Sequence, residues 1–140
     1  MCMRQFSVRV LDERDAEFVE TLVSVGIPRN VAAMITYLSN VEEATSREIE
    51  IGSNLRQPEV SVAMRVLRAN NWVEERELKK DGKGRPMKVY RLTVSLDEII
   101  KHFEEEKKRE AAKIMESIQR LRELSKKISP KGSSQQIQPG

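Results

Sequence analysis

Residues 45–77, TSREIEIGSNLRQPEVSVAMRVLRANNWVEERE, decide the fold of this chain. Thr45 lies three residues before Glu48, which is the spacing of a capping box at the start of a helix. This helix is short because the run that begins at Gly52 interrupts it, and Pro58 then opens a second helix. One face of the second helix is apolar and holds Val60, Ala63, Met64 and Leu67. The stretch therefore predicts two short helices joined by a tight turn.

The sequence on either side of this pair completes a small domain. Helical periodicity and end signals predict two further helices upstream, at residues 12–25 and 28–40. Downstream the residues 73–79 and 87–93 suit strands, and the glycines of 81–86 suit the turn between them. We expect a mainly α fold with a small β-hairpin, the arrangement of a winged helix-turn-helix.

The C-terminal third has a different pattern. Nothing breaks a helix between residues 95 and 128, which gives a length of about 50 Å at 1.5 Å per residue. Residues 129–140 are rich in Ser, Gln, Gly and Pro, so we expect a disordered tail. The sequence thus predicts a DNA-binding domain at 1–94, a long C-terminal dimerisation helix at 95–128, and the tail.

The polar face of the helix that starts at Pro58 carries side chains able to read bases. Gln can pair with adenine, Arg with guanine, and Val can contact a thymine methyl group. The residues predicted to face the bases are Gln57, Glu59, Ser61, Val62 and Arg65. Arg56 and Arg68 lie at the margins and are predicted to hold phosphates. The alternative is an ordinary amphipathic helix with a solvated polar face.

The predicted hairpin is strongly basic. Between residues 76 and 91 seven positive charges stand against Glu77 and Asp81. These charges are Arg76, Lys79, Lys80, Lys83, Arg85, Lys88 and Arg91. We expect the hairpin to follow the DNA backbone through Lys79, Lys80, Lys83, Arg85 and Lys88. Arg85, at its tip, is the best candidate for the minor groove. The alternative is a solvated hairpin kept basic to prevent pairing of sheet edges.

The segments QPEVSVAMRVLRANNWVEERE and GKGRPMKVYRLT resemble the recognition helix and wing of prokaryotic winged-helix regulators, especially archaeal ones of the TrmB, ArsR and MarR type. Val60, Leu67 and Trp72-Val73 match positions that hold the recognition helix in those families. The resemblance spans residues 28–94 and implies a transcription regulator that binds double-stranded DNA. The domain lacks the cysteines of metal-sensing ArsR members and the large effector domain of sugar-sensing TrmB members, so no effector is implied.

The long helix carries an apolar stripe near its C-terminal end. Ala111, Ile114, Ile118, Leu121, Ser125 and Ile128 follow a 3,4 alternation, with Met115 and Leu124 at its edge. Such a seam predicts pairing with the same helix of a second copy, either parallel or antiparallel. A homodimer would present two recognition helices to successive major grooves of a palindromic site. The alternative is a helix that folds back on its own domain.

Other classes of protein find little support in the sequence. The one histidine, His102, has no candidate nucleophile nearby, and Cys2 is the single cysteine. We therefore expect neither an enzyme nor a cofactor or metal site. The chain has no apolar run of the roughly 18 residues that a membrane span needs, and we expect it in the cytoplasm. The strongest rival is a winged-helix module that binds protein or RNA, which Glu59 on the predicted reading face favours.

Overall fold

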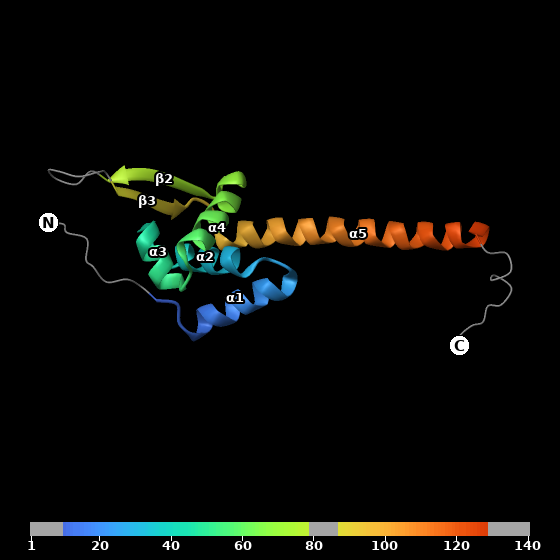
Figure 1. The fold of residues 1–140 in the computed structure, drawn as a ribbon, viewed down its shortest axis with the longest axis horizontal. Coiled ribbons are helices and arrows are strands. Elements are labelled where there is room, and N and C mark those ends of the chain that lie inside the picture. Colours follow the sequence, from blue (N-terminus) through green and yellow to red (C-terminus); the bar gives the residue numbers. More distant parts are fainter. Residues whose placement is uncertain (1–9, 79–86, 129–140) are drawn as a thin grey trace. The chain divides into compact units, whose positions relative to one another are not determined.

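The structure is a computed structural model that describes residues 10–78 and 87–128. The chain divides into two compact units, Met1–Leu96 and Asp97–Gly140. Helices α1 to α4 and strands β1 to β3 belong to the first unit. Figure 1 labels these helices and the strands β2 and β3. Helix α5 belongs to the second unit except for its first residue. The tail predicted at 129–140 lies outside the described residues.

Helix α2, Arg29–Ser39, is the centre of the first unit. All the residues from 31 to 38 are buried, because α1, α3 and α4 pack against this helix. Helix α1, Glu13–Val25, begins at Asp12, whose carboxylate accepts two backbone N–H groups of the first turn. It ends at Gly26, which has a φ of 110° that glycine adopts without strain. Both ends of α1 were predicted from the sequence.

Helix α3, Ser46–Ser53, is the first helix of the helix-turn-helix. The Thr45 hydroxyl accepts the Glu48 backbone N–H at 3.1 Å, and the Glu48 carboxylate accepts the Thr45 N–H at 2.9 Å. The predicted capping box is therefore confirmed. The helix ends at Asn54, whose φ of 59° lies in the left-handed region that asparagine tolerates. The break thus falls after Gly52 and Ser53, which are both helical.

Helix α4, Gln57–Ala69, follows after a turn of three residues. It begins one residue earlier than predicted, so that Pro58 lies inside its first turn, where the missing N–H has no helical partner to lose. After α4 the chain reverses at Asn71, which has a φ of 60°. The backbone then leads to the sheet through Trp72, whose N–H donates to the Leu67 carbonyl at 3.0 Å.

The sheet has three antiparallel strands in the order β1-β3-β2. Strands β2, Val73–Leu78, and β3, Met87–Leu92, form the predicted hairpin, with Val73 opposite Leu92 and Leu78 opposite Met87. Strand β1, Ala44–Thr45, pairs with β3 and was not predicted, because two residues are too few to show a period. β1 joins the start of α3 to the hairpin and so fixes the helix-turn-helix against the wing.

Helices and sheet enclose one apolar core in the first unit. Its fully buried side chains include Met34, Ile35, Tyr37, Leu38, Ile49, Leu67 and Val89. They come from α2, α3, α4 and β3, so the core holds both helices of the helix-turn-helix and the wing strand next to β1. This observed architecture confirms the predicted fold class.

The second unit consists of one long helix in the described residues. Helix α5, Leu96–Ile128, has Asp97 and Glu98 in its first turn and Lys126 and Lys127 in its last. These charges have the signs that stabilise the two ends of the helix dipole. Across the described ranges, we find no helix with both the length and the apolarity needed to traverse a bilayer.

Candidate nucleic-acid interface

The buried face of α4 determines which of its side chains are free for a ligand. Val60, Ala63, Met64 and Leu67 are buried, as the apolar pattern predicted. The opposite face is open to solvent, and 48% of Val62 is exposed. All five residues predicted to face the bases are exposed, namely Gln57, Glu59, Ser61, Val62 and Arg65. The side chains on this face of α4 are therefore open to an outside partner.

The N-terminal end of α4 is held by two polar contacts. The Glu59 carboxylate accepts the backbone N–H of Arg56 at 2.8 Å. The side-chain amide of Asn30, on α2, donates to the Glu59 carbonyl at 3.1 Å. Glu59 therefore caps its own helix, a role that was not predicted from the sequence. A carboxylate held in this way fixes the direction in which the first turn points.

A polar cavity of about 290 Å³ joins the exposed face of α4 to the sheet. It brings together the predicted residues Gln57, Ser61, Arg65 and Arg68. Ser46 at the start of α3 and Tyr90 on β3 also line it, and neither was predicted from the sequence as a site residue. Neither residue carries a signal in the sequence, because their proximity to α4 exists only once β1 has paired with β3. The cavity makes α4 and the wing parts of one surface.

Arg68 and Lys88, both predicted to hold phosphates, share one carboxylate in the free protein. Glu75 on β2 accepts from Arg68 Nη2 at 2.6 Å and lies 3.5 Å from Lys88 Nζ. The Arg68 guanidinium carbon also lies 6.0 Å from the centre of the Tyr90 ring. The two cations keep 52% and 54% of their side chains exposed. They are therefore accessible to an outside anion although each already has a partner.

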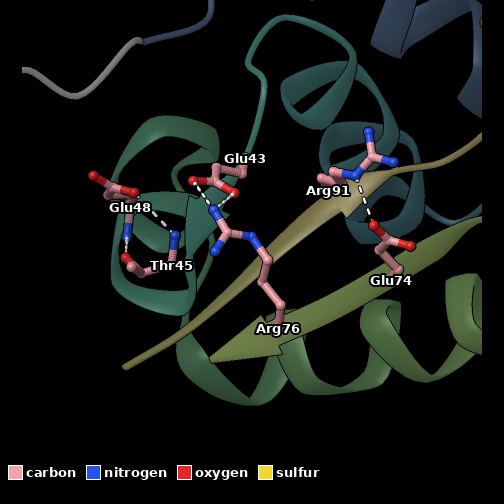
Figure 2. A network of polar contacts seen from close by, with 6 residues as sticks. All are labelled: Glu43, Thr45, Glu48, Glu74, Arg76 and Arg91. Carbon is pink, nitrogen blue, oxygen red and sulfur yellow. Dashed lines mark hydrogen bonds and ion pairs between the residues drawn. The ribbon is translucent and has the colours of Figure 1, made fainter. Parts of the chain in front are cut away.

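The other two described cations of the hairpin are also paired. Figure 2 shows Arg76 on β2 reaching Glu43, with both carboxylate oxygens within 2.9 Å of Nη2. It also shows Arg91 on β3 donating to Glu74 across the hairpin at 2.8 Å. The hydrogen bond and the charge of Glu74 raise the pKa of Arg91.

The acidic partners of these cations lie outside residues 76–91, the range for which a basic hairpin was predicted. Glu43, Glu74 and Glu75 all precede residue 76, so the described strands are less positive than the count of seven cations against two acids indicated. Arg56 and Arg65 are exposed, and neither has an ion pair within the described ranges. The predicted wing contacts Lys79, Lys80, Lys83 and Arg85 lie outside the described residues.

A second candidate surface runs along the C-terminal half of α5. Exposed fractions are 59% for Ile114, 62% for Met115, 37% for Ile118, 63% for Leu121 and 74% for Ile128. Ala111 is also exposed, and Leu124 is half-buried. Ion pairs such as Arg120 with Glu123 and Lys108 with Glu104 lie elsewhere on the helix surface. Every predicted seam residue is thus present on one continuous helix.

Comparison with known proteins gives fold-level neighbours. No family model and no curated protein matches the chain. A MarR family regulator from Neisseria meningitidis is 16% identical, with 80% of this chain and 85% of that one covered and a TM-score of 0.44. MepR, a transcription regulator of the Staphylococcus aureus multidrug efflux pump MepA, is 15% identical, with coverage of 87% and 90% and a TM-score of 0.45.

A transcriptional regulator homologue from Pyrococcus horikoshii is 22% identical over 78% of this chain and 98% of that one, with a TM-score of 0.41. The MarR part of the predicted resemblance agrees with the names of the neighbours, whereas its TrmB, ArsR and archaeal parts stay predictions. The class of fold is defined by the chain's own elements, a helix-turn-helix of α3 and α4 followed by a wing of β2 and β3.

Proposed function

We propose that this chain is a transcription regulator that binds double-stranded DNA sequence-specifically as a homodimer. The observation that carries the proposal is the open polar face of α4, which continues through the cavity lined by Arg65 and Arg68 to the wing strand β3. A helix enters the major groove with such a face, while the neighbouring ribbon holds the backbone. The proposal places the protein in the cytoplasm.

The reading groups have the chemistry that base edges require. Gln57 offers the donor and acceptor that pair with adenine, Arg65 offers the two donors that pair with guanine, and Val62 offers an apolar contact for a thymine methyl group. Ser61 lies between them on the cavity side. Glu59 is bonded to the Arg56 N–H, so we assign it to orienting the helix rather than to reading.

Backbone contacts come from the margins of the same surface. Arg56 and Arg68 lie near the two ends of α4, and Lys88 lies on β3. Lys79, Lys80, Lys83 and Arg85 extend this set along the wing in our proposal. Such contacts set the register of the protein on DNA and carry no sequence information themselves.

The homodimer rests on the apolar stripe of α5. Five large apolar side chains there keep more than a third of their surface exposed, and a helix does not keep such a stripe open to water without a partner. The 3,4 spacing fits the same stripe of a second copy. A two-fold pair would place two α4 helices about 34 Å apart, one turn of DNA.

Selection of bound fragments from random duplex DNA tests this function. We expect enriched, palindromic sites whose half-sites are about one helical turn apart. Arg65→Ala should lower affinity for the selected site by about 1–3 kcal/mol while leaving binding to random DNA nearly unchanged. Arg14→Ala, which removes the same charge from the exposed side of α1, is the matched control and should change neither.

The ion pairs of Arg76, Arg91 and Glu75 favour a second candidate, a protein-interaction module, because they reduce the positive charge of the wing strands. The two functions differ in their response to salt. DNA binding should lose affinity steeply between about 50 and 200 mM salt. Absence of any salt-dependent binding to duplex DNA would contradict the regulator and favour the module.

A further inference from the structure

We propose that Glu75 competes with the phosphates of DNA for two cations of the interface. Glu75 holds Arg68 and Lys88 in the free protein and releases them when phosphates bind. The inference rests on the proposed DNA-binding function. It assigns to an acidic residue of the wing the role of limiting affinity for DNA of any sequence.

The geometry places one carboxylate between two elements of the interface. Glu75 is on β2, Arg68 is on α4 and Lys88 is on β3. One oxygen of Glu75 accepts from Arg68 at 2.6 Å, and the other lies 3.5 Å from the Lys88 ammonium. Arg68 lines the polar cavity, and Lys88 is the one predicted phosphate contact of the wing that lies within the described residues. The Glu75 carboxylate therefore occupies the position at which phosphates of bound DNA would contact Arg68 and Lys88.

The exposure of the three groups makes the exchange of partners easy. Glu75 keeps 31% of its side chain exposed, and the two cations keep more than half. Ion pairs with such exposure contribute little to folding stability. A phosphate contact on DNA also releases condensed counterions, which a protein carboxylate cannot do. The phosphate should therefore displace the carboxylate at ordinary salt concentrations.

The contact of Arg68 with Tyr90 indicates that Glu75 competes for Arg68 and is not needed to position it. If Glu75 alone held Arg68 in place, loss of the carboxylate would leave the guanidinium without a fixed direction. Arg68 also lies 6.0 Å from the centre of the Tyr90 ring, and both residues line the cavity. An arginine within about 6 Å of an aromatic ring centre is attracted to the face of the ring without any carboxylate. We therefore expect Tyr90 to retain Arg68 at the cavity when Glu75 releases it.

This competition has a defined consequence for recognition. It lowers affinity for every sequence by a similar factor, because phosphates are the same in all DNA. Stable occupancy then depends on the base contacts of α4. Glu75→Gln should increase affinity by about three- to tenfold on both a selected site and random DNA, the size expected for two exposed ion pairs. The ratio of the two affinities should stay constant.

The experiment measures binding of the full chain to a fluorescent random-sequence duplex of about 30 base pairs, and to a selected site, between about 50 and 200 mM salt. Glu75→Gln should also steepen the slope of log K against log salt by about one. Glu20→Gln is the matched control. Glu20 lies on α1, away from the proposed interface, and its substitution removes the same charge and likewise deprives an arginine, Arg29, of its carboxylate partner. In an Arg68→Ala background the gain from Glu75→Gln should shrink.

Each other outcome overturns the inference. Weaker binding by Glu75→Gln would make Glu75 a positioning residue for Arg68. An equal gain in Glu20→Gln would reduce the effect to overall charge. If Glu75→Gln folds like the wild type and binds DNA with unchanged affinity, competition by Glu75 is refuted while the proposed function stays intact. Absence of DNA binding by the wild type itself would refute the proposed function, and the competition with it.

Discussion

The seam of α5 allows a quantitative prediction for Leu121→Asp. Full burial of a leucine side chain contributes about 1.5–3 kcal/mol. Since 63% of Leu121 is exposed in the single chain, its burial in a dimer would contribute about 1–2 kcal/mol per copy. A two-fold interface contains the residue twice, which gives about 2–4 kcal/mol in total. The dimer dissociation constant should therefore rise by roughly 30- to 800-fold.

This range is a lower bound for aspartate, because its charge also loses hydration in an apolar seam. Gln119→Asp is the matched control. It adds the same charge with the same helix propensity two residues away, outside the 3,4 pattern of the stripe. The control should dimerise like the wild type.

Sedimentation equilibrium of the two variants and the wild type measures the dissociation constants directly. Operator binding by Leu121→Asp should weaken together with dimerisation, because a monomer presents one α4 helix instead of two. Equal dissociation constants for both variants would place the interface elsewhere. A wild type that stays monomeric at all concentrations would refute the homodimer.

Two further predictions concern the first unit. Leu67→Ala should lower the free energy of unfolding by about 2–5 kcal/mol in chemical denaturation, because Leu67 is fully buried on the inner face of α4. An effect no larger than that of Val66→Ala, at a position 37% exposed, would contradict the described core. The hydrogen bond from Arg29 lowers the pKa of Glu20 below 4.5, so the stability it adds is present above pH 4.5 and is lost as the pH falls through the lowered pKa. The Tm difference between wild type and Glu20→Gln should therefore disappear at low pH, and a difference independent of pH would refute this contribution.

The local parts of the fold were predictable from the sequence. Caps at Asp12 and Thr45, the stop at Gly26 and the apolar face ending at Leu67 depend on residues within a few positions of each other, and the structure confirms them. Physical periodicity within a helix is enough to separate its buried and exposed faces. The exposed face of α4 could therefore be identified before its surroundings were known.

What the sequence did not predict depends on residues far apart in the chain. Strand β1 exists because Ala44 pairs with Tyr90, and Arg76 reaches Glu43 across 33 positions. Such partners are chosen by the tertiary fold, and a local count of charge does not include them. This explains why Glu43 was missed, whereas Glu74 and Glu75 lie on β2 itself and were left out only because the count of charge began at residue 76.

The most direct test of the account is the map of backbone amide NMR shifts when the full chain binds a selected duplex. We predict that the largest changes fall on the exposed face of α4, at Ser61, Val62 and Arg65, and extend to Lys88 on β3. The amides of α1 should change little. Changes confined to α1 or α5, with α4 unaffected, would contradict the claim that α4 enters the DNA.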